Sequence, residues 1–324
     1  MTATSASGTT SNAASGATKT PLGTKLIGYV QLGKVRIYHH AYGWLLALLL
    51  LRLDGRVGGD TAAALALTLL MVCATQWSGG AADDLGGYRD GSDARNYAGR
   101  PASTVAKKPL LTGVLTEREA VRFGVAMWVI AIAAGLGAVA SLDGTAPLAA
   151  ILVMLVGQIA SVQYSTGLKL SYLPAGLEIT IFYVIGCIGL VPYWLIAGQV
   201  SSESLIASAL VGLWFLLIVS YGNASDKEGD SEVSRYTLAV LLPPAAFKVF
   251  LGLLFAASVT LLTLLYTTTR FDPMLGLTAV PVVVLHAVQL YYGAGKEEWR
   301  KARFIGLSSV DLGCLGLALA FLLA

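Results

Sequence analysis

Nine separate runs of apolar residues divide this chain, and their length constrains its fold more than any other feature. Each run is close to the ~20 residues with which an α-helix crosses ~30 Å of hydrocarbon. Backbone polar groups cannot stay unpaired in lipid, so such runs fold as helices. We predict an all-α, polytopic membrane protein with nine transmembrane helices around a central cavity. The runs cover approximately residues 36–53, 61–81, 121–141, 147–164, 174–197, 205–221, 245–267, 273–291 and 304–323.

Composition supports this interpretation. Only 13% of the residues are charged and the mean hydropathy is +0.70, whereas a soluble domain carries roughly 25% charged residues. The 324 residues therefore form one hydrophobic unit rather than two soluble domains. The net charge of +3 is too small for a nucleic-acid-binding protein, and the basic residues are confined to particular loops rather than forming a stripe.

The first twenty residues differ in composition from the rest of the chain. They are rich in Ser, Thr, Ala and Gly, so they cannot bury enough apolar surface to fold. We predict a disordered tail at residues 1–20 and a single transmembrane domain at residues 21–324. The three cysteines lie in apolar runs without a C-x-x-C spacing, and we interpret them as buried hydrophobic residues.

The basic residues indicate how the helices are oriented. With the amino terminus in the cytoplasm, the 22 lysines and arginines all face the cytoplasm except Arg52, Arg56, Arg270 and, near the start of the seventh helix, Lys248. Basic loops stay on the cytoplasmic side of a membrane. We therefore predict a protein of the cytoplasmic membrane with its N terminus and polar loops in the cytoplasm and its C terminus outside.

Acidic residues gather in two of these cytoplasmic loops, each of which also contains basic residues. Carboxylates hold Mg²⁺ together with waters and substrate phosphates, and basic side chains bind the remaining phosphate oxygens. Two such clusters over one pocket would form a diphosphate–magnesium site. The clusters are Asp83, Asp84, Asp90 and Asp93 after the second helix, and Asp226, Glu228, Asp230 and Glu232 after the sixth.

A single charged loop is more simply a solvated loop that ends a helix. Here the acidic cluster occurs twice, each time in the middle of a set of four helices. Helices one to four and five to eight resemble two pseudo-repeated halves, followed by a ninth helix. Repeats of this kind are common in membrane proteins whose site lies between the halves, so the duplication favours a site.

The second acidic segment resembles a known motif. Residues 221–240, YGNASDKEGDSEVSRYTLAV, are similar to the second aspartate motif of the UbiA superfamily of intramembrane prenyltransferases, in particular its menaquinone-pathway (dihydroxynaphthoate polyprenyltransferase-like) branch. That motif has an Asn, then D-x-x-x-D, a basic residue and T-L-A-V. Asn223, Asp226, Asp230 and Arg235 stand at matching spacings, although Ser-Arg replaces the usual Gly-Lys.

The first acidic segment matches the family less completely. The branch has N-D-x-x-D-x-x-x-G-x-D, and residues 83–93 read DDLGGYRDGSD. Asp84 and Asp93 match, Asp83 replaces the Asn, and Gly87 replaces the central Asp. Asp90 offers a carboxylate at a shifted position.

Two further segments extend the resemblance over the chain after residue 20. The KKPLLTG segment at residues 107–113 is similar to the family's R-P-L-x-x-G segment. Residues 164–178 resemble the family's connection between helices four and five. The family also has nine helices.

The resemblance implies Mg²⁺-dependent ionisation of an isoprenyl diphosphate within the bilayer and transfer of the prenyl group to an aromatic or quinone-precursor acceptor. It implies metal ligands at Asp84, Asp93, Asp226 and Asp230, supported by Asp83, Asp90 and Asn223. The implied diphosphate-binding residues are Lys107, Lys108, Lys169 and Arg235, with Arg89 and Arg95 as additions. Tyr164 would stabilise the allylic cation or orient the acceptor, or it would be an aromatic residue of the membrane interface.

A few polar residues lie within or beside the apolar runs. Asp311 is expensive to bury and therefore a candidate functional residue, for which we expect Lys248 or a basic residue of the last loop as partner. Glu178 would bond the backbone or position an acceptor. His286 is more simply a core histidine, and His39 and His40 mark the membrane interface.

Two alternative functions stay open. The same ionisation without an acceptor would make the chain a membrane terpene cyclase, and the missing carboxylate at Gly87 keeps this alternative open. A transporter is the more remote alternative. Transporters hold their ligands at broken helices near the middle of the membrane, whereas the acidic residues of this chain lie in predicted surface loops.

Overall fold

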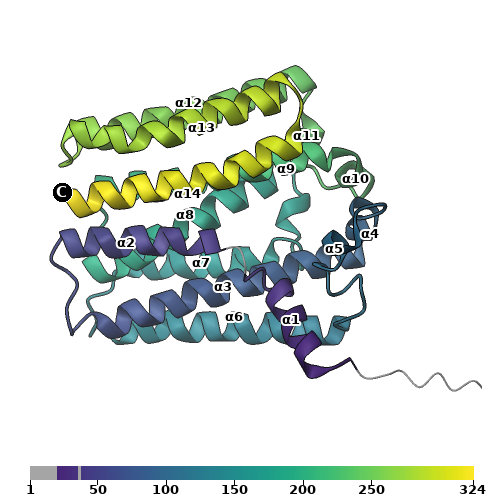
Figure 1. The fold of residues 1–324 in the computed structure, drawn as a ribbon. Helices are drawn as coiled ribbons and strands as arrows, with labels where there is room; N and C mark the ends of the chain where they lie inside the picture. Colours follow the sequence, from purple (N-terminus) through teal and green to yellow (C-terminus); the bar gives the residue numbers. More distant parts are fainter. Residues whose placement is uncertain (1–19, 36–37) are drawn as a thin grey trace, which may run out of the picture.

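The structure, a computed structural model, describes residues 20–35 and 38–324. Every regular element within these ranges is a helix, which confirms the predicted all-α class. The long helices lie side by side in one bundle (Figure 1). The predicted disordered tail lies outside the described residues except for Thr20.

Seven helices of the described part of the chain are long and apolar enough to cross a membrane. They are α3 (Ala62–Arg89), α6 (Glu117–Ala140), α8 (Gly176–Ala197), α9 (Ser202–Ser225), α12 (Pro244–Thr268), α14 (Trp299–Leu323), and the continuous segment formed by η3 (Pro273–Ala279), α13 (Val280–Leu290) and η4 (Tyr291–Gly295).

The predicted count of nine crossings is not confirmed. The other two predicted runs form α2 (Tyr42–Leu53), with 12 residues, and α7 (Leu148–Gln163), with 16 residues. At 1.5 Å per residue α7 is about 24 Å long, which is less than the hydrocarbon core. The run that contains α2 is shortened at its start, where η1 (Tyr38–Ala41) places two histidines before the helix.

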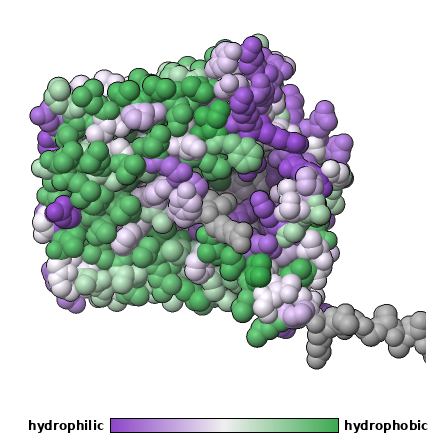
Figure 2. All heavy atoms as spheres, in the orientation of Figure 1, coloured by the Kyte–Doolittle hydropathy of each residue, from purple (hydrophilic) through white to green (hydrophobic). Residues whose placement is uncertain are grey.

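The polar ends of the bundle carry short helices. These are α1 (Leu22–Leu32), α4 (Ser92–Asn96), α5 (Ala102–Val105), η2 (Leu170–Tyr172), α10 (Lys227–Glu232) and α11 (Leu238–Leu241). Helices α4, α5, α10 and α11 share one end, and the C terminus lies at the opposite end (Figure 1). Figure 2 shows that polar residues concentrate at the end with the short helices, whereas the visible sides of the long helices are largely apolar.

Capping residues define where two of the long helices begin. The Thr116 side chain accepts a hydrogen bond from the backbone N–H of Glu119, and the Glu119 side chain accepts one from the backbone N–H of Thr116. Helix α6 therefore starts in a capping box. Ser201 and Ser204 make the same arrangement at the start of α9. Helix α9 then runs through the centre of the bundle, where Trp214 is fully buried against α12 and α14.

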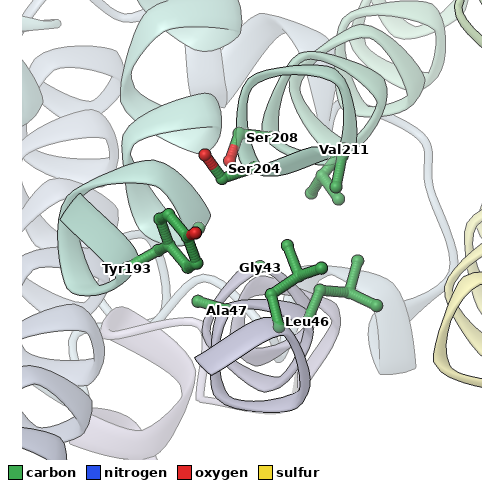
Figure 3. Close-up of a pocket in the computed structure, with 10 residues that line it drawn as sticks. Gly43, Leu46, Ala47, Tyr193, Ser204, Ser208 and Val211 are labelled. Carbon is green, nitrogen blue, oxygen red and sulfur yellow. The ribbon is translucent and has the colours of Figure 1, made fainter. Parts of the chain in front are cut away.

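A tight contact between α2, α8 and α9 fills the bundle away from the polar end. A Cβ added at Gly43 of α2 would lie 2.9 Å from the backbone nitrogen of Gly189 in α8. The space left beside Ser204 and Ser208 is only about 10 Å³, room for about one water molecule (Figure 3). This pocket is a packing gap and cannot hold a substrate.

Candidate active site

The two acidic segments meet at the same end of the bundle. Asp83 and Asp84, predicted in the loop after the second helix, lie instead in the last turns of α3, and Asp90 and Asp93 follow its end; the second segment begins where α9 ends. Arg100 Nη2 lies 3.3 Å from Asp226 Oδ1, and Arg95 Nε lies 3.5 Å from Glu232 Oε2. The structure therefore brings together parts of the chain that lie 126 and 137 positions apart in the sequence.

A cavity of about 460 Å³ opens beside these segments. Its size is typical of small-molecule sites. One part of its wall is apolar and another part is polar, which suits a ligand with a charged head and a hydrocarbon tail. The apolar wall includes Leu177, Ile181, Val184, Ile185, Phe215 and Ile218, and the polar wall includes Lys34, Asp83, Tyr164, Asn223, Asp226, Arg235 and Arg303.

Asp83 is the carboxylate that the first segment contributes to the cavity wall. Lys34 donates to its Oδ2 at 2.5 Å, and Ser165 donates to its Oδ1 at 3.1 Å. A Cβ at Gly86 would lie 2.6 Å from the Ser165 Cβ, so glycine lets the loop after α7 approach α3 this closely. Burial disfavours the Lys34 charge, but Asp83 and Asp84 outweigh it and raise the pKa of Lys34.

Asp84 and Asp93 share one lysine. Lys108 Nζ donates to Asp84 Oδ1 and to Asp93 Oδ2, each at 2.9 Å. Burial opposes the Lys108 charge, but the two carboxylates hold the pKa of Lys108 above its usual value. A Cβ at Gly87 would lie 2.8 Å from Asp93 Cγ, so the Asp93 carboxylate lies beside the position where the family's central Asp is missing.

Asp90 belongs to a different set of contacts. Its carboxylate accepts a hydrogen bond from the Tyr172 hydroxyl and another, at 2.8 Å, from the backbone nitrogen of Ser92. The Arg235 guanidinium lies over the Tyr172 ring, 4.9 Å from its centroid. Tyr172 thus connects the first segment to the basic residue of the second.

The two aspartates of the second segment lie in different surroundings, Asp226 at the cavity and Asp230 buried beside Arg235. Asp226 ends α9 and lines the cavity, whereas Asp230 is 3% exposed and lies 4.0 Å from Arg235. Burial raises the pKa of Asp230 to about 7.

Asn223 lines the cavity and donates to Glu178 at 3.3 Å. Glu178 also accepts from the backbone nitrogen of Leu238 at 2.9 Å, and so ties α8 to α9 and α11.

Four of the predicted diphosphate-binding residues lie farther out. Lys107 and Lys169 are exposed, and Lys169 lies over the Tyr172 ring. Arg89 pairs with Glu117 at 2.7 Å, and Arg95 pairs with Glu232. Among the predicted basic residues, Arg235 lines the cavity and Lys108 lies beneath it against Asp84.

Tyr164 lines the cavity, next to the loop that carries Ser165. Burial, together with the nearby Asp83 carboxylate, raises the pKa of Tyr164 well above its ordinary value. The side chain is therefore a neutral phenol whose ring can face a cation.

The predicted partner of Asp311 is wrong. Lys248 pairs with Glu297 at 2.6 Å instead. Asp311 accepts a hydrogen bond from Tyr42 at 2.7 Å, and its Oδ1 lies 3.3 Å from His39 Nε2. Because α14 packs against α2, a residue near the C terminus meets the start of the bundle. His286 is buried beside Trp214, away from the cavity.

The oxygen donors of the cavity fit a metal that arrives with a diphosphate. The described residues contain no group of three His, Cys, Asp or Glu side chains that could hold a metal alone. Mg²⁺, however, is usually bound by one or two carboxylates plus substrate phosphates. Asp83, Asn223 and Asp226 offer such donors. The buried Nε atoms of Arg100 and Arg235 have no partner among the described residues, and an anion would satisfy them.

Sequence reasoning missed Lys34 and Arg100 as site residues. The sequence marks both only as basic residues on the cytoplasmic side, because neither lies in a motif. Their place beside the acidic residues depends on contacts across 49 and 126 positions of the sequence. No local signal predicts such contacts.

Comparisons with known proteins agree with this geometry. The UbiA prenyltransferase family model matches residues 42–309. No curated protein matches the chain significantly. The fold is similar to that of a digeranylgeranylglyceryl phosphate synthase, with a TM-score of 0.66 and 15% identity, over 93% of this chain and 99% of that one.

Two other solved structures show the same fold. A UbiA homologue from Archaeoglobus fulgidus bound to DMAPP and Mg²⁺ has a TM-score of 0.59 and 15% identity, over 90% of this chain and 99% of that one. A UbiA homologue from Aeropyrum pernix K1 has a TM-score of 0.65 and 17% identity, over 88% and 98%. Since the family model covers most of the chain, this protein belongs to the UbiA prenyltransferase family.

Proposed function

We propose that the chain is a Mg²⁺-dependent prenyltransferase that ionises an isoprenyl diphosphate within the bilayer and transfers the prenyl group to an aromatic or quinone-precursor acceptor. The observation that carries this proposal is the cavity, whose polar wall combines residues of both acidic segments and whose remaining wall is apolar. An isoprenyl diphosphate has the same division of polarity. The solved A. fulgidus homologues, bound to DMAPP or GPP with Mg²⁺, support the same ligand class.

Different residues at the cavity would bind the metal, bind the phosphate oxygens and stabilise the allylic cation. Asp83, Asn223 and Asp226 would hold the metal, which supplies positive charge to the leaving diphosphate. Arg235 and Arg100 would donate to phosphate oxygens through their Nε groups, which have no partner among the described residues. Preplaced charges of this kind stabilise the developing negative charge without reorganisation. The apolar wall keeps water from the allylic cation, and the Tyr164 ring would stabilise it.

The remaining predicted residues would act around this centre. Asp84 and Asp93, which share Lys108, and Asp230, beside Arg235, would add carboxylate ligands for the metal if these two cations paired with the diphosphate instead. Asp90 would hold Tyr172 in place. Lys107, Lys169, Arg89 and Arg95 would attract the diphosphate from the cytoplasm.

We also propose that α2 and α7 cross the bilayer with the seven longer helices, giving nine crossings in two related halves plus α14. The acidic segments and the N terminus would then face the cytoplasm, and the C terminus would lie outside. The opposite placement of the C terminus and the acidic end supports this orientation (Figure 1). The resemblance of the second motif favours a bicyclic acceptor of the menaquinone-branch type.

The experiment is an assay of the detergent-purified protein with Mg²⁺ and geranyl, farnesyl or geranylgeranyl diphosphate, with and without an added phenol or naphthoate. The proposal predicts pyrophosphate release that depends on the acceptor. Cyclic hydrocarbons or terpene alcohols without an acceptor would instead identify the cyclase. Substrate that stays intact under every condition would favour the transporter and reject both enzymes.

A matched pair of variants tests the site. Asp226→Asn should nearly abolish turnover while the protein stays folded, because the cavity loses a charged ligand. Asp143→Asn makes the same chemical change at an exposed loop position with φ 47°, and it should leave turnover unchanged. Equal activity of the two variants would reject the proposed metal site.

A further inference from the structure

The wall of the cavity includes a lysine from outside both acidic segments. This residue, Lys34, follows the end of α1. Its Nζ donates to Asp83 Oδ2 at 2.5 Å and lies 3.7 Å from Asp84 Oδ1. The side chains of Lys34 and Asp83 are 27% and 28% exposed, so ions can reach this pair from the cavity. Burial opposes the Lys34 charge, but the two carboxylates keep the pKa of Lys34 above its ordinary value, and the side chain stays an ammonium.

The backbone of Lys34 is in a conformation that favours glycine. Its φ of 52° is the left-handed conformation in which many helices end, and glycine usually supplies it. The backbone nitrogen of Lys34 donates to the Gln31 carbonyl oxygen, and that of Val35 donates to the Val30 carbonyl oxygen, so this turn closes α1. Residues other than glycine lose stability in this conformation, and such residues concentrate at functional sites. The side chain of Lys34 is therefore a candidate for a function that glycine could not supply.

Close packing fixes the end of α1 against α3. A Cβ at Gly80 of α3 would lie 3.1 Å from the Leu32 carbonyl oxygen, and Leu32 itself is fully buried. Asp83 stands three residues after Gly80, so the face of α3 that receives α1 also presents this carboxylate. The fold thus holds the backbone before Lys34 in place and brings its ammonium to Asp83.

Every aspartate that we propose as a metal ligand has a basic side chain within 4.0 Å. Of these basic residues, Lys34 and Arg235 line the cavity, and Lys34 makes the closer contact with its aspartate. A divalent cation that takes Asp83 as a ligand competes with the Lys34 ammonium, because both bind the same carboxylate. The pairs are Lys34–Asp83, Lys108–Asp84, Lys108–Asp93, Arg100–Asp226 and Arg235–Asp230.

We propose that Lys34 couples the binding of the metal to the binding of the diphosphate. The inference rests on the proposed prenyl transfer. Without the diphosphate, Lys34 competes with the divalent cation for Asp83 and keeps the metal affinity low. When an isoprenyl diphosphate binds, the ammonium exchanges the carboxylate for a phosphate oxygen and stays paired, so Asp83 becomes available to the metal. Metal and diphosphate then raise each other's affinity by the same factor.

The test measures Mn²⁺ binding to the detergent-purified protein by electron paramagnetic resonance. It is done with and without geranyl thiolodiphosphate, in which sulfur replaces the bridging oxygen and slows ionisation. Lys25→Met is the matched control for Lys34→Met, because it removes an ammonium from the same helix whose partner, Glu119, does not line the cavity. Without the analogue, we expect Lys34→Met to bind Mn²⁺ about tenfold or more tightly than wild type and Lys25→Met, the effect of one lost charged hydrogen bond.

The enhancement of Mn²⁺ affinity by the analogue should fall by a similar factor in Lys34→Met. A merely structural defect would weaken metal binding, so the expected gain separates the two explanations. Lys34→Gln can still donate to Asp83, and it should shift the affinity in the same direction if Lys34→Met is too unstable to purify. In the Asp83→Asn background, Lys34→Met should change the Mn²⁺ affinity much less, because the contested carboxylate is gone.

Two results would overturn the coupling. One is a Lys34 variant that binds Mn²⁺ no more tightly than Lys25→Met without the analogue. The other is an enhancement by the analogue that is as large in the Lys34 variant as in wild type. A wild-type protein that binds no Mn²⁺ even with the analogue would instead overturn the proposed function.

Discussion

Lys108→Met isolates the buried charge cluster of the first acidic segment. The substitution keeps an unbranched side chain, one atom shorter, but removes the ammonium that donates to Asp84 and Asp93 at 2.9 Å each. Asp84 is only 2% exposed, so water cannot replace the lost partner, and Lys34 Nζ, 3.7 Å from Asp84 Oδ1, would be its remaining cation. Breaking a buried pair from one side costs about 3–5 kcal/mol, and we expect a loss of unfolding free energy of this size without Mg²⁺.

The loss should depend on pH. Burial raises the pKa of Asp93 even with Lys108 in place, and removal of Lys108 raises it further. A carboxyl whose folded pKa exceeds its unfolded pKa stabilises the fold below the unfolded value, and this contribution is lost as pH rises through the folded value. The unfolding free energy of Lys108→Met should therefore be closest to that of wild type near pH 5 and farthest below it near pH 8.

The assay is denaturant unfolding in detergent at several pH values. Lys107→Met is the matched control, because Lys107 is the exposed neighbour of Lys108. Adding Asp93→Asn to Lys108→Met should recover part of the loss, since it removes one uncompensated charge. The reasoning is refuted if Lys108→Met and Lys107→Met unfold within about 1 kcal/mol of each other at pH 8.

Three further predictions concern other parts of the site. Burial raises the pKa of Asp230 to about 7, so in the absence of Mg²⁺ wild type should lose stability relative to Asp230→Asn as pH rises through 7. Thermal unfolding of both proteins from pH 5 to 8 measures this difference. Parallel plots of Tm against pH would contradict the prediction. Glu178→Ala removes the acceptor of Leu238 and Asn223 and should cost about 1–3 kcal/mol, measured by unfolding against Glu117→Ala, an exposed carboxylate. Arg235→Ala should raise the KM for the diphosphate about tenfold or more, and Lys169→Ala, at an exposed position, should raise it much less. Equal effects of the two substitutions in steady-state kinetics would place the phosphate contact elsewhere.

Much of this architecture could be predicted from the sequence. Apolar runs of the length of a bilayer predicted the long helices, and the spacing of Asn223, Asp226 and Asp230 predicted the family, which the family model confirms. These signals are local. The roles of the individual site residues stay predictions, although the structure places Asp83, Asp226, Asn223, Arg235 and Tyr164 around one cavity.

The features that sequence reasoning missed depend on tertiary packing. The contact of Tyr42 with Asp311 joins residues 269 positions apart, and only the packing of α2 against α14 produces it. Helix α7 nearly fills its predicted run, but the start of α2 could not be predicted, because Tyr38–Ala41, inside the predicted run, form the short helix η1 instead of the first turn of α2. Lys34 reaches Asp83 only because α1 lies beside α3.

The central claim is that both acidic segments serve one metal–diphosphate site, and anomalous diffraction from crystals grown with Mn²⁺ and geranyl diphosphate tests it most directly. The account predicts a metal peak bonded to the diphosphate, with carboxylate oxygens from the α3 end and from the α9 end each about 2.1 Å away, as expected for octahedral ions of this kind. A diphosphate bound with metal ligands from one segment alone, or a metal peak outside the cavity, would contradict the account.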